Sequence, residues 1–225
     1  MRIALISDIH ANLAALEAVL ADVPGVDRIV CCGDLVEYYD QPNEVCARLR
    51  ELEIPCIRGN HDAYTIGALP EKEAHRAAFR TDWTRETLHE THFAWLESLD
   101  VELRVEADGR RLRVRHASPW DEETYLYPDS HELFERIELA PGEILAVGHT
   151  HRPLHVAIGD GWLVNPGSVG QPRDGDPRAA YAVVDMVTGA VEHRRVTYDV
   201  SAVQRRLEAK GWDPQIVAIL SRTRD

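Results

Sequence analysis

Apolar and polar residues follow one pattern in the first quarter of the chain and other patterns in the rest. The first part has short apolar runs, typical of buried strands, separated by stretches with apolar residues at helical spacing. These runs predict strand 1–6, helix 12–21, strand 28–32, helix 43–52 and strand 54–58. Strands and helices in alternation indicate an α/β unit whose strands form a parallel sheet.

The pattern changes at residue 63 and again at residue 101. Residues 63–100 have apolar and aromatic positions typical of helices. We expect them to form either a cap beside the functional site or a helical pair over one sheet face. Asp108-Gly109 predicts a type I′ hairpin, and residues 201–210 predict a helix. Short strands are expected at 101–105, 111–115, 144–147, 155–158, 162–164, 180–184 and 191–197.

The length of 225 residues allows one large domain or two small ones, and we expect one domain over residues 1–225 because residue types that bind metals are spread from position 8 to position 151. Apolar residues make up 44% of the chain and charged residues 28%, which is ordinary for a globular protein. No apolar stretch reaches the roughly 18 to 20 residues that span a bilayer, so we expect a cytoplasmic protein without a membrane partner. The net charge of −13 makes long nucleic acid an unfavourable partner, while a small phosphate ester is still allowed. The oligomeric state is left open.

Residue types that bind metals stand where the apolar runs end. Asp8-Ile9-His10 follows the first predicted strand, and in extended backbone its alternate side chains would share a face and reach one cation. Gly33-Asp34 follows the next strand, where the glycine permits a sharp turn and the carboxylate is placed to bridge two metals. Further donors of the same kind are Asn60, His61, His116, His149 and His151. This inventory predicts a two-metal hydrolase site.

The order of these motifs resembles that of the calcineurin-like metallophosphoesterase superfamily. The motifs read DxH, GD, GNHD, H and GHTH, and the run PGSVGQPR at 166–173 is similar to its small bacterial and archaeal phosphodiesterase branch. The resemblance covers nearly the whole chain. It implies an α/β fold of two packed mixed β-sheets flanked by α-helices, in four layers. It also implies two metal sites, one with Asp8, His10, Asp34 and His151 and the other with Asp34, Asn60, His116 and His149.

The same resemblance implies a phosphodiesterase in which hydroxide, activated by two divalent metals, attacks a small phosphate ester. His61 is then a proton donor near the leaving-group oxygen and not a ligand. Manganese is favoured, and iron, zinc, cobalt or nickel would suit the nitrogen and oxygen donors. Two dications with two carboxylates and a hydroxide leave a charge of about +1, which a phosphodiester balances. A monoester prefers a further cation, for which Arg173 is the first candidate, followed by Arg58 and Arg152.

Two positions depart from the common family pattern. Ala117 stands where many relatives have glycine, and Val36-Glu37-Tyr38-Tyr39 stands where many have Val-Gly-Tyr-Gly. The second change bears on the shape of the substrate pocket and not on the metal centre. Asp62 is expected to cap the following segment or to orient His61.

Several residues and functions stay open at this point. Trp120, Tyr125 and Tyr127 either pack or stack on an aromatic part of the substrate. Two other functions compete with a phosphodiesterase. One is a phosphomonoesterase, including a protein serine/threonine phosphatase, and the other is a non-enzymatic scaffold on the same fold. Histidines outside the motifs are expected at the surface or in packing, namely His75, His89, His92, His131, His155 and His193.

Overall fold

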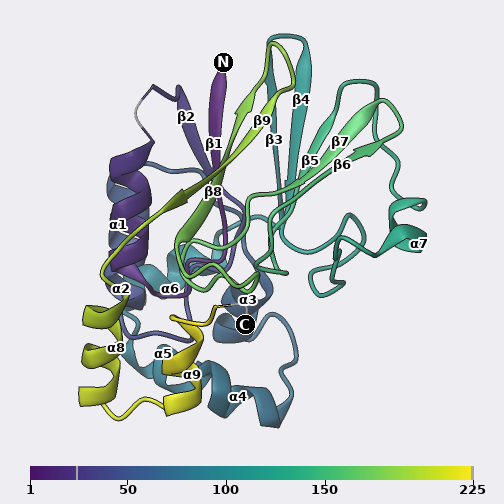
Figure 1. The fold of residues 1–225 in the computed structure, drawn as a ribbon. Coiled ribbons are helices and arrows are strands. Elements are labelled where there is room, and N and C mark those ends of the chain that lie inside the picture. The colour runs from purple at the N-terminus through teal and green to yellow at the C-terminus, as the bar shows by residue number, and fades with distance from the viewer. Residues whose placement is uncertain (24, 224–225) are drawn as a thin grey trace.

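Two β-sheets pack face to face between helices in the computed structural model, which describes residues 1–23 and 25–223 (Figure 1). The first sheet has the order β2-β1-β8-β9, and only β1 and β2 are parallel. The second has the order β3-β4-β5-β7-β6, and β5 is parallel to both its neighbours. The strands are β1 (Arg2–Ile6), β2 (Arg28–Cys31), β3 (Glu102–Ala107), β4 (Arg110–Arg115), β5 (Ile144–Ala146), β6 (Leu154–Ile158), β7 (Gly161–Asn165), β8 (Ala179–Asp185) and β9 (Val191–Val196).

Helices cover the outer face of the first sheet and one end of both sheets (Figure 1). Those on the sheet face begin at polar caps, such as Asn12, whose side chain accepts a hydrogen bond from the Ala15 amide at 3.3 Å. In the described part of the chain, no helix has the length and apolar character needed to cross a membrane. The helices are α1 (Leu13–Asp22), α2 (Pro42–Glu51), α3 (Asn60–Ile66), α4 (Glu73–Phe79), α5 (Thr81–Thr87), α6 (Glu90–Glu97), α7 (His131–Phe134), α8 (Val200–Ala209) and α9 (Pro214–Ile219).

Strand β1 is buried on both faces, which explains its continuous apolar sequence. Ile3 and Leu5 belong to the core between the two sheets, together with Ile144 of β5. Ala4 and Ile6 point the other way and belong to the core shared with α1 and α2. A further cluster on the outer face of the second sheet contains residues of α7, so the expected layers of helices and mixed sheets are confirmed.

The segment 63–100 divides into four helices and not into a helical pair. Leu96 of α6 joins the core beneath α1 and α2, so this part covers a sheet face. Pro70, Glu71, Lys72, His75 and Phe79 instead line a cavity beside the candidate site. A cap formed by this part of the segment stays a prediction.

The expected strand 54–58 is wrong. This segment makes one isolated bridge, between Cys56 and Cys31, before the chain turns into α3. Helices α7 and α9 were not expected, because elements of four and six residues are too short to show a helical period. The type I′ hairpin is consistent with the positive φ of both Asp108 (52°) and Gly109 (79°).

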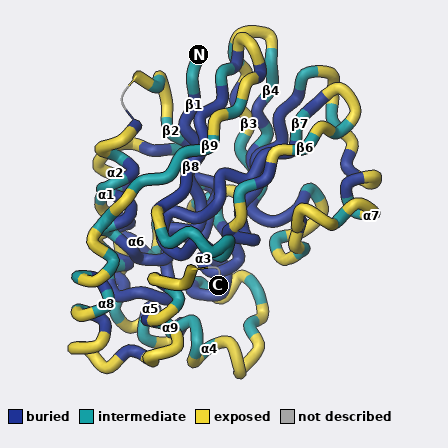
Figure 2. The backbone as a smooth tube through the Cα atoms, viewed as in Figure 1, coloured by how far each residue is buried: buried dark blue, intermediate teal, exposed yellow. Residues whose placement is uncertain are grey.

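The loops at the two ends of the sheets differ in burial (Figure 2). Residues 7–12, 32–40 and 147–151, which follow β1, β2 and β5, are buried throughout. The hairpin loops at the opposite end, such as 108–109 and 187–188, are exposed. Because loops ordinarily lie at the surface, buried loops rich in polar residues need partners for those groups.

Candidate metal centre

The buried loops carry their polar side chains on left-handed backbone. The φ angle is positive at each of five positions where the backbone changes direction, Asp8 (54°), His10 (51°), Asp34 (58°), His149 (67°) and His151 (57°). Non-glycine residues adopt this conformation at a cost of about 1–3 kcal/mol each, and such strain gathers at functional sites. The expected extended backbone at 8–10 is therefore wrong, although both side chains still reach the same place.

Neighbouring loops approach so closely that glycine is required at the contacts. A Cβ atom on Gly59 would lie 2.2 Å from Oδ1 of Asp34, and one on Gly170 would lie 1.8 Å from the carbonyl oxygen of Ile9. Asp62 links two of the loops, because its carboxylate accepts hydrogen bonds from the amides of Gly59 (2.9 Å) and Asp34 (3.0 Å). The expected capping role of Asp62 is confirmed.

Two groups of donor atoms converge where these loops meet. The first group consists of Asp8, His10, Asp34 and His151, and one donor atom from each lies within 4.8 Å of the others. Nε2 of His10 is 3.1 Å from Nε2 of His151, which in turn is 3.3 Å from Oδ1 of Asp8. All four side chains are buried.

The second group consists of Asp34, His116 and His149 and meets the same criterion. Nε2 of His116 lies 3.1 Å from Oδ2 of Asp34 and 3.0 Å from the amide oxygen of Asn60. Asp34 therefore belongs to both groups, and Asn60 adds an oxygen donor to the second.

Hydrogen bonds to the backbone decide which ring nitrogen of each histidine faces the centre. Nδ1 donates to a carbonyl oxygen in His10 (Val36, 3.2 Å), His116 (Cys32, 2.8 Å) and His151 (Gln171, 2.6 Å). Nε2 of each ring then faces the other donor atoms. Burial favours a neutral His116 ring, but Asp34 raises the pKa of His116 to about 10. His149 is reversed, because its Nε2 donates to the carbonyl oxygen of Glu123 at 3.0 Å. Such supporting bonds are typical of histidines that bind metals.

The two carboxylates have oxygens without a well-aligned hydrogen-bond donor. Oδ2 of Asp8 and Oδ2 of Asp34 are both buried and accept no well-aligned hydrogen bond from the described residues, although Nε2 of His116 lies 3.1 Å from Oδ2 of Asp34. Burial raises the pKa of the Asp8 carboxyl to about 6. Burial also favours a neutral Asp34, but the His116 and His61 rings outweigh it and lower the pKa of Asp34 well below its ordinary value. Burial lowers the pKa of His10 and His151, which keeps both rings neutral.

These features fit divalent cations. Buried anionic oxygens that lack well-aligned donors are costly unless a positive charge faces them. Neutral imidazoles with lone pairs directed inward complete the nitrogen and oxygen donor set that transition metals prefer. The structure thus contains a buried candidate metal site, and every residue expected to bind metal lies within it or, for Asn60, against it.

His61 lies beside the donor groups and is held by Glu37. Its Nδ1 is 2.6 Å from Oε2 of Glu37, and the other carboxylate oxygen accepts from the hydroxyl of Thr65 at 2.9 Å. Its Nε2 lies 4.0 Å from Oδ2 of Asp34. Burial favours the neutral ring, but Asp34 and Glu37 together raise the pKa of His61 above its ordinary value. Glu37, and not Asp62, therefore orients His61.

The two arginines expected to bind substrate differ in position. Arg173 follows the loop 166–172, and its guanidinium donates to the hydroxyl of Tyr38 (3.1 Å) and to Gln171 (2.6 Å). Arg58 pairs with Glu122 at 3.4 Å, and neither arginine is among the residues that line the neighbouring cavity.

A cavity of about 560 Å³ opens beside the donor groups, with Asn60, His61 and His149 in its lining. Sequence reasoning missed Glu37, Tyr64, Phe79 and His75 as parts of this region, because none belongs to a motif with a metal-binding pattern. The departure at Val36-Glu37-Tyr38-Tyr39 was the one signal in the sequence that pointed here.

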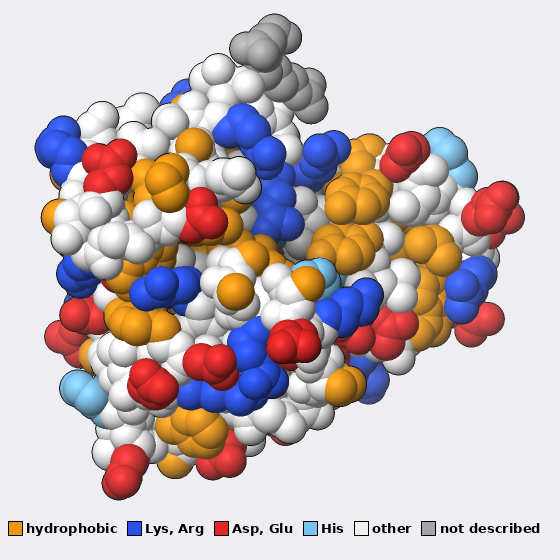
Figure 3. All heavy atoms as spheres, turned by 90° about the horizontal axis from the view of Figure 1, so that it is seen from below, with side chains coloured by type: hydrophobic (Ala, Val, Ile, Leu, Met, Phe, Trp, Pro, Cys, Tyr) orange, Lys and Arg blue, Asp and Glu red, His pale blue; other side chains and the backbone are white. Residues whose placement is uncertain are grey.

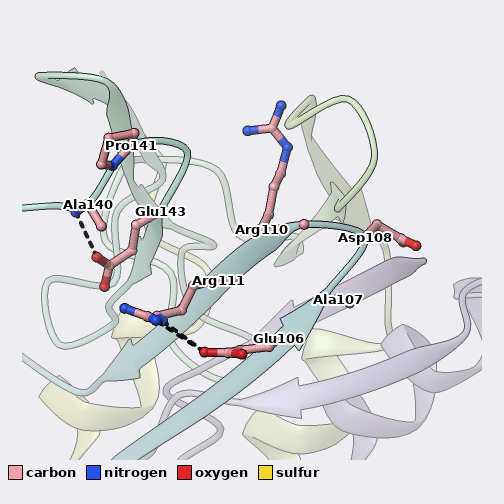
Figure 4. A pocket seen from close by; sticks show the side chains of 9 residues that line it. Glu106, Ala107, Asp108, Arg110, Arg111, Ala140, Pro141 and Glu143 are labelled. Atoms are coloured by element: carbon pink, nitrogen blue, oxygen red, sulfur yellow. Dashed lines mark hydrogen bonds and ion pairs between the residues drawn. The ribbon is translucent and has the colours of Figure 1, made fainter.

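A second cavity, of about 430 Å³, lies at the opposite end of the second sheet (Figure 4). Most of its charged side chains are already paired. Arg111 lies 3.1 Å from Glu106, and Glu143 lies 3.3 Å from Arg113 and accepts from the Ala140 amide. In the portion of the chain that the structure describes, no group of three or more metal-binding residues lies there.

Comparisons with known proteins agree with this geometry. Residues 1–189 match the sequence model of the calcineurin-like phosphoesterase superfamily domain. The chain is 33% identical to an uncharacterized protein of Methanocaldococcus jannaschii over 91% of each chain, and 28% identical to phosphodiesterase YfcE of Escherichia coli over 82% of this chain and 88% of that protein. The crystal structure of a metallophosphoesterase from Sphaerobacter thermophilus superimposes with a TM-score of 0.84 at 34% identity, over 99% of this chain and 98% of the other.

Proposed function

The chain belongs to the calcineurin-like phosphoesterase superfamily, and we propose that it is a phosphodiesterase that uses two divalent metal ions to hydrolyse small phosphate esters. The observation that carries this proposal is the pair of buried donor groups that share Asp34 and contain two carboxylate oxygens without a well-aligned hydrogen-bond donor among the described residues. We assign Asp8, His10, Asp34 and His151 to one ion and Asp34, Asn60, His116 and His149 to the other.

When bound, the two ions would supply Lewis-acid chemistry, activating water and neutralising charge on the phosphoryl oxygens. The chain itself supplies the proton for the leaving group. Against the effect of burial, Asp34 and Glu37 raise the pKa of His61, which favours the protonated ring, and the bond from Nδ1 to Glu37 leaves Nε2 to donate toward the cavity. Such general-acid catalysis contributes about 10²- to 10⁴-fold in rate.

Several observations support an anionic ester as the substrate. Lys and Arg side chains lie among Asp and Glu side chains on the face seen in Figure 3, although the whole chain carries −13. We place Arg173 at the phosphate, because its amide donates to the carbonyl oxygen of His151 (3.2 Å) and its charge lies close enough to act on Asp8. The similarity to phosphodiesterase YfcE supports a preference for diesters.

The decisive experiment compares a diester with the matching monoester. Protein loaded with Mn²⁺ is assayed with bis(p-nitrophenyl) phosphate and with p-nitrophenyl phosphate, and the diester should have the higher kcat/KM. His61→Ala should lower kcat by about 10²- to 10⁴-fold without changing the bound metal. A faster monoester would reverse our order and favour the phosphomonoesterase. No turnover of any ester by protein with both ions bound would favour the scaffold.

Other expectations from the sequence, on the metal, the location and the domain, stay predictions. Manganese is expected to give the highest activity, and replacing it in turn with iron, zinc, cobalt and nickel tests this. The cytoplasmic location and the single domain over residues 1–225 belong to the same proposal.

A further inference from the structure

The cavity beside the donor groups is larger than a phosphoryl group needs. Its volume of about 560 Å³ falls in the range of clefts that enclose whole small molecules. His61, the proposed proton donor, is in its lining, so the cavity surrounds the leaving-group side of the reaction. The chemistry of the remaining walls therefore indicates what kind of leaving group the protein accepts.

One wall is a continuous set of aromatic rings. Phe79 lies at its centre, with ring centroids 5.1 Å from Tyr38 and 6.4 Å from Tyr64, and the Tyr64 ring is nearly parallel to it (10°). His75 adds a further ring 5.0 Å from Phe79. Tyr38 and Tyr64 are buried and Phe79 is half-buried, and an aromatic surface of this kind beside a hydrophilic metal site favours a planar apolar group.

Tyr125 belongs to the lining of the same cavity, and it is held in place by a metal-binding residue. Its ring stacks on His149 at a centroid distance of 3.8 Å, and 41% of the residue is exposed. Sequence analysis expects Tyr125 either to pack or to stack on a substrate. One position of the ring allows both, because the ring packs on His149 and also lines the cavity.

The carboxylates of the cavity disfavour a chain of further phosphates, although the exposed Lys72 also belongs to the lining. Glu71 accepts a hydrogen bond from Thr81 (2.6 Å) and lies 3.5 Å from Arg76. Glu123 accepts a hydrogen bond from the hydroxyl of Tyr64, and the described residues form no ion pair with it. A carboxylate at this place repels a second phosphate and accepts hydrogen bonds from hydroxyl or amino groups.

We propose that the leaving group of the natural substrate is a nucleoside, whose base stacks on the ring wall of Tyr38, Tyr64 and Phe79 while Glu123 accepts a hydrogen bond from a sugar hydroxyl. This inference rests on the proposed function and names the substrate class of the same site. Stacking is tolerant of base identity because every base has a π-face, so purine and pyrimidine nucleosides should both bind.

The test measures binding and does not depend on turnover. Protein loaded with Mn²⁺ is titrated by calorimetry with adenosine 5′-monophosphate and with ribose 5-phosphate, which share the phosphate and the sugar and differ only in the base. The nucleotide should bind at least about tenfold more tightly. Equal affinities in the unaltered protein would overturn the inference.

Variants test which residues cause the difference in affinity between the nucleotide and ribose 5-phosphate. Phe79→Leu and Tyr125→Leu should each remove most of the gain from the base and leave the affinity for ribose 5-phosphate unchanged. The matched control is Trp120→Leu, which alters an aromatic residue of similar exposure (37%) that is not in the cavity lining. Loss of the gain in the control but not in the cavity variants would also overturn the inference. Circular dichroism of each variant verifies the fold, and the comparison in unaltered protein is independent of it.

The outcomes separate the two proposals. Normal diester hydrolysis with no gain from the base leaves the phosphodiesterase standing and rejects the nucleoside. A gain from the base without hydrolysis of any ester supports the nucleoside site and rejects the phosphodiesterase. Failure of both phosphates to bind rejects the nucleoside site as well.

Discussion

The two ends of the β-sheets each have a cavity and charged residues, but the charges are used differently. At the hairpin end, Glu106 pairs with Arg111 and Asp108 with the amino terminus, and these side chains are largely in contact with water. At the other end, Asp8 and Asp34 are buried and each has an oxygen that accepts no well-aligned hydrogen bond from the described residues. Neither the volume of a cavity nor the number of its charges identifies a metal site. Buried carboxylates gathered with histidine nitrogens do, because a cation between them offsets the cost of burying their charge.

The largest expected effect comes from removing the carboxylate that the two donor groups share. Asp34→Asn should weaken binding of Mn²⁺ by more than about 100-fold, since loss of even a supporting residue costs 10- to 100-fold. Metal content after dialysis and calorimetric titration measure it, with Asp108→Asn at the hairpin end as the control. Full metal content in Asp34→Asn would contradict the assignment of a metal site to this end of the sheets and not to the hairpin end.

A smaller effect, on kcat, is expected when Glu37, the hydrogen-bond partner of His61, is replaced by a neutral residue. Glu37→Gln should lower kcat by roughly tenfold with little change in KM, because a hydrogen bond to a charged group contributes about 1.5–3 kcal/mol. The carboxylate raises the pKa of His61, so its removal should lower that pKa and reduce the protonated fraction as pH rises. The loss in kcat should therefore grow from pH 6 to pH 8. An unchanged pH profile would mean that Glu37 only fills space.

Asp40 is a buried carboxylate at the same end of the sheets as Asp8 and Asp34, but it has two basic side chains as partners. It lies 3.0 Å from Arg206 and 2.6 Å from Lys210, both on or next to α8, and these groups lower its pKa against the effect of burial. Asp40→Asn should lower the free energy of unfolding by about 2 kcal/mol at pH 7. The difference should disappear as pH falls through the lowered pKa, because the native carboxyl is then protonated too. Urea unfolding of the two proteins at pH 7 and at acid pH tests this.

The smallest effect is expected at the hairpin end. Glu106→Gln breaks an ion pair whose side chains are 72% and 42% exposed, and exposed pairs contribute about 0–1 kcal/mol. Stability, metal content and kcat should all stay close to those of the unaltered protein. A clear loss of activity would give the cavity of Figure 4 a function that its paired charges do not indicate.

Prediction from the sequence was most accurate where a residue's role depends on its near neighbours. Apolar runs identified most strands and helices, and the confirmed mixed sheets followed from the family resemblance. The expected strand 54–58 failed because pairing depends on a distant strand, and Cys31 offers it only one bridge. Asp8 and His10 reach the site on left-handed and not extended backbone, which a pattern of residue types does not reveal.

The sequence by itself determined which side chains are available to bind metal and the order in which the chain presents them. Only the tertiary structure decided that Glu37 holds His61, 24 positions away, and that Phe79 and Tyr64 form a wall beside it. Most ligand motifs are short because their donors stand in the loops that follow strands, so they are visible locally. Contacts between loops depend on how two sheets pack and on where strained backbone turns a side chain, and these are properties of the assembled fold.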